Sequence, residues 1–231
     1  MASIESYKKQ AAVAAVELVH SGMVLGLGHG STFQYVLEPL AARLRNGELR
    51  NLNAIPCSRH TEAEMLRLGI PLGDLNAFPS LDMTIDGADE VDPQYNLIKG
   101  GGGALLREKI VAQSSSRNVI IIDESKLSGA LGTNHSLPLE LIPFGWERQR
   151  DFIAELGGNP RLRVDINGKP VFSDQGNYLL DCETGPITDL KMLAGKLESR
   201  SGILEHGLFL GLATDVIVAG PSGLHRFQAK P

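Results

Sequence analysis

The chain has few of the residues that mark secreted, membrane or nucleic-acid-binding proteins. Its 231 residues include two cysteines, Cys57 and Cys182, and no Cys-x-x-Cys pair, which predicts reduced thiols instead of a disulfide framework. No apolar run approaches the roughly 18 residues of a membrane span. The net charge of −5 gives no sign of a basic nucleic-acid footprint. Residues 1–5 lack the features of a signal peptide. We therefore expect a cytoplasmic protein; a plastid location after loss of a transit peptide stays open.

The first half of the chain alternates between short apolar runs and segments with helical spacing. Such alternation is typical of a mainly parallel sheet with helices on both faces, an α/β fold of Rossmann-like character. Strands are predicted at 23–27, 53–58, 81–85 and 118–122, and helices at 7–20, 33–45, 61–68 and 104–115.

The pattern changes after about residue 130. Strands are predicted at 137–142, 161–166, 177–182 and 203–210, with helices at 146–156 and 188–199. This β-α-β-β-α-β order is that of a smaller ferredoxin-like α+β domain, inserted before the last strands. The run 215–219 is expected to return to the first sheet. The predicted division is a catalytic α/β domain of residues 1–131 and 208–231 and a lid or oligomerisation domain of residues 132–207.

A glycine-rich motif, Gly-Leu-Gly-His-Gly-Ser-Thr at 26–32, follows the first predicted strand and opens a helix. Backbone amides at a helix N-terminus, with two hydroxyls, suit an anion such as phosphate. The motif is neither a dinucleotide fingerprint, because Ser31 replaces the third glycine, nor a Walker motif. A plain strand-to-helix turn with Ser31 as N-cap is an open alternative.

Four acids stand within seven residues at the end of the third predicted strand: Asp86, Asp89, Glu90 and Asp92. A solvated acidic loop and a metal site are both conceivable for such a cluster. No further ligands of suitable spacing are obvious, so we expect no metal. Carboxyl groups held close to lysines can instead share protons, as acid–base catalysis requires.

The most informative stretch is Lys99 followed by four glycines, with Glu108 shortly after. Consecutive glycines are costly in conformational entropy, so something must require a bare backbone there. Glu108 sits about one turn into its helix, where the macrodipole favours its charge; a purely helix-stabilising role is the alternative. Lys126 closes a turn after the fourth strand. In a parallel sheet, motifs that follow strands gather along one edge.

Together these motifs closely resemble ribose-5-phosphate isomerase of the A type, over essentially the whole chain. The resemblance rests on the glycine-rich motif at 26–32, on Asp-Gly-Ala-Asp-Glu at 86–90, on Lys-Gly-Gly-Gly-Gly-Ala-Leu-Leu-Arg-Glu-Lys at 99–109 and on Ser-Lys at 125–126. It implies an enzyme that interconverts D-ribose 5-phosphate and D-ribulose 5-phosphate in the non-oxidative branch of the pentose phosphate pathway.

The resemblance also implies roles for individual residues. Glu108 matches the proton acceptor that moves hydrogen between C2 and C1 through a cis-enediolate. Asp86 or Asp89 would open the sugar ring, and Lys99 would stabilise the developing oxyanion. The positions that match the family's substrate-binding residues are Lys8, His29, Gly30, Ser31, Thr32, Asp86, Gly87, Ala88, Asp89, Lys99, Gly100, Gly101, Gly102 and Lys126.

One position departs from the family's pattern: His29 stands where threonine is usual, although its backbone amide remains. The resemblance implies no cofactor and no metal, a sugar phosphate as the small-molecule partner, and a homodimer or homotetramer. Two other functions are compatible with this layout of motifs. An amino-sugar phosphate deaminase is disfavoured by the complete Lys-Gly-rich-Arg-Glu-Lys segment, and a non-catalytic sensor or assembly subunit by the presence of Lys99 and Glu108.

Overall fold

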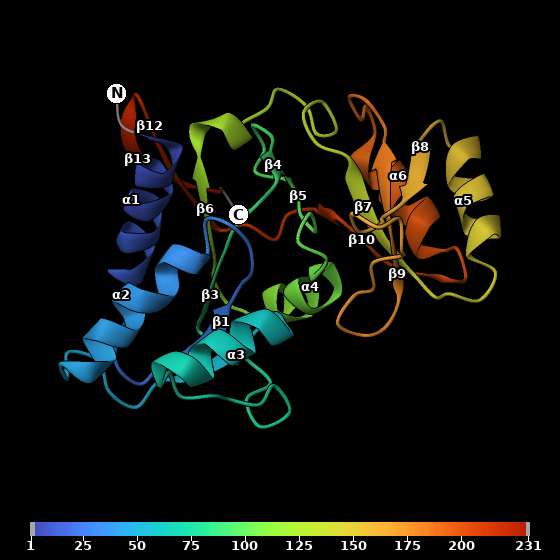
Figure 1. Ribbon diagram of the computed structural model, residues 1–231. Helices are drawn as coiled ribbons and strands as arrows, with labels where there is room; N and C mark the ends of the chain where they lie inside the picture. The colour runs from blue at the N-terminus through green and yellow to red at the C-terminus, as the bar shows by residue number, and fades with distance from the viewer. Residues whose placement is uncertain (1–2, 230–231) are drawn as a thin grey trace. The chain divides into compact units, whose positions relative to one another are not determined.

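The computed structural model describes residues 3–229, and the contacts within the chain divide it into two units (Figure 1). Unit 1 comprises Met1–Ala88, Arg107–Lys126 and Gly211–Pro231, and unit 2 comprises Asp89–Leu106 and Leu127–Leu210. The sequence predicts the segment 89–106 in the first domain, whereas its contacts group it with unit 2. The catalytic and lid or oligomerisation roles of the two domains stay predictions.

Unit 1 contains a six-stranded sheet in the order β13-β12-β6-β3-β1-β2. All neighbouring strands run parallel except β12 and β13, which form an antiparallel hairpin. The strands are β1 (Val24–Leu27), β2 (Asn53–Pro56), β3 (Met83–Asp86), β6 (Asn118–Asp123), β12 (Asp215–Gly220) and β13 (Gly223–Gln228).

Helices pack on both faces of this sheet, as the alternation predicts. Helices α1 (Ile4–Val16), α2 (Gln34–Arg45) and α3 (Arg59–Leu68) contribute to the larger core, in which Leu25, Ile85 and Ile121 supply strand side chains. Val111 of α4 (Leu105–Gln113) packs with Ile55 and other apolar residues in a separate cluster. A short 3-10 turn, η1 (Glu124–Lys126), follows β6.

Unit 2 contains two antiparallel sheets. Three short strands, β4 (Glu90–Val91), β5 (Leu97–Ile98) and β11 (Leu208–Phe209), form one sheet in the order β11-β5-β4. The other has the order β10-β7-β9-β8 and carries helices α5 (Trp146–Glu155) and α6 (Leu190–Glu198). Its strands are β7 (Leu137–Leu141), β8 (Asn159–Leu162), β9 (Tyr178–Glu183) and β10 (Ile203–His206). The predicted β-α-β-β-α-β unit is therefore present.

A fully buried carboxylate, that of Glu90, ties β4 to the loop that precedes β7. It accepts hydrogen bonds from the backbone N–H groups of Gly132, Asn134 and His135 at 2.9, 3.1 and 3.3 Å. A buried charge is tolerated only when its hydrogen-bonding capacity is met. Glu90 of the acidic motif is thus a structural residue.

The predicted elements differ from the structure in several places. Helix α1 is shifted toward the N-terminus, because Ser3 caps it through the N–H of Ser6, and it ends at Val16. The predicted strand at 203–210 is two strands, separated by Gly207, whose N–H donates to Pro138 O. Strands β4 and β5 are too short to show a periodicity. Every residue of β13 is exposed, so the strand shows no apolar alternation.

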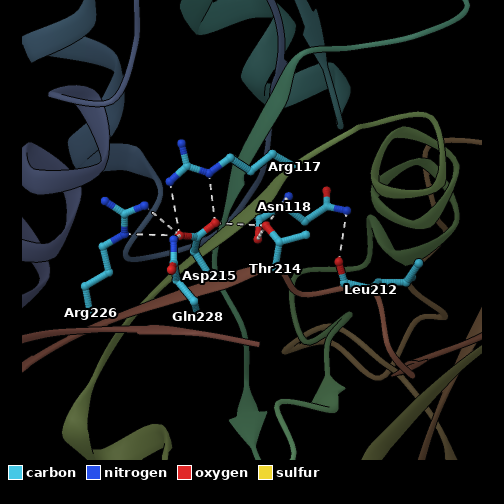
Figure 2. A network of polar contacts seen from close by, with 7 residues as sticks. All are labelled: Arg117, Asn118, Leu212, Thr214, Asp215, Arg226 and Gln228. Carbon is cyan, nitrogen blue, oxygen red and sulfur yellow. Dashed lines mark hydrogen bonds and ion pairs between the residues drawn. The ribbon is translucent and has the colours of Figure 1, made fainter. Parts of the chain in front are cut away.

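At the amino ends of β6 and β12, Asp215 is the centre of a polar network (Figure 2). Arg117 donates to both of its carboxylate oxygens at 2.8 and 3.0 Å, and Arg226 donates to Oδ1 at 3.1 and 2.8 Å. Burial by itself would raise the pKa of Asp215. The hydrogen bonds from the two arginines and from Thr214 outweigh it and hold that pKa well below its usual range.

Each unit holds one buried cysteine. Cys57 lies in unit 1 and Cys182 in unit 2, they are 0% and 1% exposed, and they form no disulfide. Burial raises the pKa of the Cys182 thiol to about 11. Within residues 3–229, no helix is both long and apolar enough to span a membrane.

Candidate functional site

The loop after β1 and the end of β3 are joined through the carboxylate of Asp86. Its Oδ1 accepts the backbone N–H groups of His29 at 3.0 Å and Gly87 at 2.7 Å, and the residue is 3% exposed. Gly28 is required by this contact, because a Cβ there would lie 2.0 Å from Asp86 Oδ1. The glycine-rich motif and the acidic motif thus form one structural feature of unit 1.

His29 is held by side chains as well as by its backbone. Ser58 Oγ lies 3.0 Å from its Nδ1, and the ring of His60 packs edge-on at 5.7 Å between centroids. Thr61 Oγ1 donates to the carbonyl of Gly28 at 2.7 Å. The backbone amide of His29 donates to Asp86 and so helps to fix the loop.

The beginning of α2 shows that Ser31 is not an N-cap. The capping position is taken by Phe33, which makes no side-chain cap. Ser31 is exposed and Thr32 is 6% exposed. Gly30 has φ of +110°, and its carbonyl accepts the N–H of Gln34. The capping alternative from the sequence is therefore wrong.

Glu108 lies toward the carboxyl ends of the parallel strands. Asn118 Nδ2 donates to the carbonyl of Ala112 at 2.9 Å, so α4 ends at the amino end of β6. Val111 covers the middle of β1, since a Cβ on Gly26 would lie 2.5 Å from Val111 Cγ1. At a rise of about 1.5 Å per residue, Glu108 lies roughly 4.5 Å beyond Val111, toward the loop that follows β1. It is 4% exposed.

Two lysines of unit 1 were expected to bind substrate. Lys8 lies in α1, its side chain is 13% exposed, and its Nζ is 3.1 Å from Glu5 Oε1. Glu5 is also hydrogen-bonded to Tyr35 in the first turn of α2, which brings Lys8 close to the start of that helix. Lys126 is partly buried in η1, at the carboxyl end of β6.

The remaining predicted residues belong to unit 2. Lys99 follows β5, is 3% exposed, and its ammonium lies 5.5 Å from the ring centroid of Phe209. Its backbone N–H donates to the carbonyl of Gly207 at 2.9 Å. The strand pairing of β5 and β11 therefore fixes the lysine at the entrance to the glycine run.

The glycine run is a turn whose amides are largely engaged. Gly101 N–H donates to Asp89 Oδ2 at 2.7 Å, and a Cβ on Gly101 would lie 2.8 Å from Asp89 Oδ1. Gly103 N–H donates to Gly100 O at 2.9 Å, and Gly103 has φ of +82°. Gly103 is thus a turn residue, and the run is bare partly because a carboxylate approaches its backbone.

The structure places the predicted residues in two sets. Unit 1 brings Asp86, His29 and the 30–32 loop together, with Gly87 and Ala88 following β3, and it also holds Glu108. Unit 2 brings Asp89 together with Gly101. Among residues 3–229, no three His, Cys, Asp or Glu side chains form a group that could hold a metal ion.

Comparison with known proteins identifies the family. A family model described as ribose 5-phosphate isomerase A (phosphoriboisomerase A) matches residues 53–223. The ribose-5-phosphate isomerase A of Chloroflexus aurantiacus is 53% identical over 222 residues, 96% of this chain and 93% of that protein. The chain belongs to the ribose 5-phosphate isomerase A family.

Relatives and solved structures of the family cover the whole fold. A probable chloroplastic ribose-5-phosphate isomerase of Arabidopsis thaliana is 43% identical, over 96% of this chain and 83% of that protein. The ribose 5-phosphate isomerase of Plasmodium falciparum superimposes with a TM-score of 0.95 at 39% identity, covering 98% and 100% of the two chains. A D-ribose-5-phosphate isomerase in complex with phospho-erythronic acid gives 0.95 at 33% identity, with the same coverage.

Family membership confirms the predicted fold class and the prediction of an isomerase enzyme. Sequence reasoning missed two residues that hold the site's loops. Ser58, beside His29, carries the ordinary signal of a helix N-cap. Arg163 donates to the carbonyls of Gly100 and Gly101, and no local motif marks it.

Proposed function

We propose that the chain interconverts D-ribose 5-phosphate and D-ribulose 5-phosphate through a cis-enediolate. Family membership supports the reaction. The observation that carries the proposal is that Glu108 and Lys99, a carboxylate and an ammonium, are 4% and 3% exposed. Burying ionisable groups is costly, and enzymes accept that cost at sites of proton transfer and charge stabilisation.

Ring opening comes first, and we assign it to Asp89. Oδ1 of Asp86 already accepts two backbone amides, and the residue is 3% exposed. Asp89 is partly exposed, and one of its oxygens holds Gly101 N–H. Asp89 is therefore the better placed to exchange a proton with the ring oxygen, while Asp86 shapes the loop.

Glu108 then takes the proton from C2 and returns it at C1. A carboxylate with an ordinary pKa of about 4.3 is a weak base toward such a carbon acid. Stabilisation of the oxyanion that develops must therefore supply much of the acceleration. Lys99 and the N–H groups of the glycine run are the proposed donors. Proton transfer and charge stabilisation are within reach of these groups, so no cofactor is proposed.

The substrate's phosphate and hydroxyl groups are assigned to the loop after β1 and to the lysines. Ser31, Thr32, Lys8 and Lys126 would hold them, with His29 as an additional contact. The related structure with phospho-erythronic acid supports this assignment, because that ligand combines a phosphate with a planar carboxylate that resembles an enediolate in shape and charge.

We further propose that the protein is cytoplasmic and forms a homodimer or a homotetramer.

An assay in deuterated water tests the reaction and its mechanism together. The purified protein, without added metal, is expected to form ribulose 5-phosphate from ribose 5-phosphate. Deuterium should appear at C1 of the ketose, because the base exchanges its proton with solvent. Complete retention of the C2 hydrogen over many turnovers would instead point to a hydride shift and contradict the enediolate. Ammonia release from an amino-sugar phosphate, without ribulose 5-phosphate, would instead identify a deaminase.

A further inference from the structure

Arg163 follows β8 in unit 2, and its side chain is 16% exposed. Its Nε and Nη2 donate to the two carboxylate oxygens of Asp181 at 2.8 and 2.5 Å. A bidentate pair of this kind fixes the plane of the guanidinium as well as its position. Asp181, in the centre of β9, thereby sets the direction of the remaining N–H groups of the Arg163 guanidinium.

These remaining N–H groups donate to backbone carbonyls of the glycine run. Nη1 of Arg163 donates to the carbonyl oxygens of Gly100 at 3.3 Å and Gly101 at 3.1 Å, and Nη2 donates to Gly100 O at 3.3 Å. One cation thus holds two successive carbonyls. Hydrogen bonds from a charged donor are roughly twice as strong as neutral ones, so this contact decides how the two peptide groups are turned.

The orientation of the amides follows from the planarity of the peptide bond. In a trans peptide, the N–H points away from the carbonyl of the preceding residue. With Gly100 O directed at Arg163, the N–H of Gly101 must point away from it, and there it meets Asp89. With Gly101 O held by the same guanidinium, the N–H of Gly102 must likewise point away from Arg163.

Of the amides in the run, those of Gly101 and Gly103 already have acceptors. We propose that Arg163 is a positioning residue for the isomerase reaction: it turns the Gly101–Gly102 peptide so that the N–H of Gly102 donates to the enediolate oxygen. This inference rests on the proposed function, in which the amides of the run stabilise that oxygen. Arg163 itself does not touch the substrate.

Without the guanidinium, little holds this peptide in one orientation. Glycine adopts positive and negative φ about equally, so adjacent glycines can rotate their shared peptide group at small steric cost. The donor would then point at the oxyanion for only part of the time. Losing an oxyanion donor lowers kcat by roughly 100- to 1000-fold, and a peptide that is mobile but still present should lose less.

The test compares Arg163→Met with Arg161→Met. Arg161 lies two residues earlier, within β8, and forms an exposed ion pair with Glu183 of β9, so it controls for the loss of a cation from this part of unit 2. We expect Arg163→Met to lower kcat at least tenfold with KM changed less than threefold, because phosphate contacts are retained. Arg161→Met should keep the wild-type kcat. Equal kcat values in the two variants would overturn the proposal.

Two further measurements separate positioning from a merely structural role. Guanidinium ion at non-denaturing concentration should restore a measurable part of the kcat of Arg163→Ala, because the ion can occupy the vacated place beside Asp181. Binding of phospho-erythronic acid, measured by calorimetry, should weaken in Arg163→Met but not in Arg161→Met. A loss of kcat with no rescue and unchanged binding of that analogue would also overturn the proposal.

A readout that does not depend on turnover keeps this inference apart from the proposed function. Amide hydrogen exchange of the 97–106 segment should be faster in Arg163→Met than in Arg161→Met. If the wild-type protein does not isomerise ribose 5-phosphate, the proposed function fails. Unchanged exchange in Arg163→Met would instead refute the positioning of the loop, whatever the activity.

Discussion

Both ends of the six-stranded sheet carry a buried aspartate, and the two are stabilised in different ways. Asp215, the first residue of β12, is bound by the side chains of Arg117 and Arg226. Asp86, the last residue of β3, is bound by the backbone amides of His29 and Gly87. Side-chain cations hold the charge at the amino end, and main-chain dipoles hold it at the carboxyl end.

We expect this difference to separate stability from catalysis. The arginines on Asp215 join strand β12 to residues of two other segments, so that network links parts of the sheet. The amides on Asp86 shape the loop that follows β1, where a ligand of an α/β sheet binds. We therefore expect substitutions at the amino end to change the unfolding temperature and those at the carboxyl end to change the rate.

The largest effect is expected from Glu108→Gln, which should lower kcat at least 100-fold because the variant lacks the proposed general base. The unfolding temperature should change little, since glutamine keeps the size of the side chain. Steady-state assays and thermal unfolding measure both. Glu62→Gln, which removes a first-turn glutamate from α3, is the matched control for a loss of helix-dipole stabilisation. A kcat near that of the control would place the base elsewhere.

The next comparison is Asp89→Ala against Asp86→Ala. Asp89→Ala should lower kcat by about 100-fold if Asp89 opens the ring, with little change in stability, because Gly101 N–H lies at an exposed position. Asp86→Ala leaves two amides without their acceptor, which should destabilise the protein by about 1–3 kcal/mol. If Asp89→Ala lowered the unfolding temperature but kept the wild-type kcat, the roles of the two aspartates in ring opening and in stabilising the loop would be reversed.

Asp215→Asn is expected to affect stability alone. Breaking a fully buried ion pair costs roughly 3–5 kcal/mol; since the side chains of Arg117 and Arg226 are 30% and 39% exposed, a loss of about 2 kcal/mol is expected after allowing for solvent screening. Chemical denaturation measures it, with the exposed Asp151→Asn of α5 as a control that should lose much less stability. A marked loss of kcat in the folded variant would show that the amino end of the sheet affects catalysis as well as stability.

The pH dependence of the Asp215 effect follows from the lowered pKa. The unfolded carboxyl has a pKa near 3.9, and the folded one lies well below its usual range. The stability from this group is therefore complete above roughly pH 5 and is lost only as pH falls through the folded pKa. The gap in stability between wild type and Asp215→Asn should stay constant from about pH 5 to 8 and narrow in stronger acid.

The smallest effect is expected from His29→Thr, which restores the residue usual in the family. The hydrogen bond from the backbone amide of residue 29 to Asp86 does not need the imidazole, so kcat and KM should change less than about threefold, an effect below 0.7 kcal/mol. Steady-state kinetics at several pH values check this. A tenfold rise in KM would show that the imidazole binds the phosphate.

The sequence predicts the fold well where periodicity and chain order carry the information. The parallel strands and their helices follow from apolar runs separated by glycines. The second antiparallel sheet follows from the β-α-β-β-α-β order. The exposed strand β13 and the two-residue strands β4 and β5 leave no such pattern, because β13 buries neither face and β4 and β5 are too short to show a period.

The candidate site shows the same limit. Residues such as Glu108 and Lys99 are recognisable because they stand in dense local motifs. Arg163 reaches the glycine run from 62 residues away in the chain, and a single arginine in a hairpin has no local signal. The engagement of His29 N–H by Asp86 depends on a contact over 57 residues. Side chains that act on main-chain groups of a distant loop are found only once the fold is known.

The two buried cysteines give the protein a built-in probe of its own motions. A thiol-specific reagent can reach Cys57 only when unit 1 opens and Cys182 only when unit 2 opens, since both are essentially inaccessible in the folded state. The labelling rates of the two thiols, followed by mass spectrometry of the separated peptides, report opening free energies for each unit without any substitution. Once each rate is divided by the reactivity of the same thiol in the unfolded chain, equal opening free energies would mean that the protein unfolds as one cooperative body, and unequal ones that one unit opens while the other stays closed.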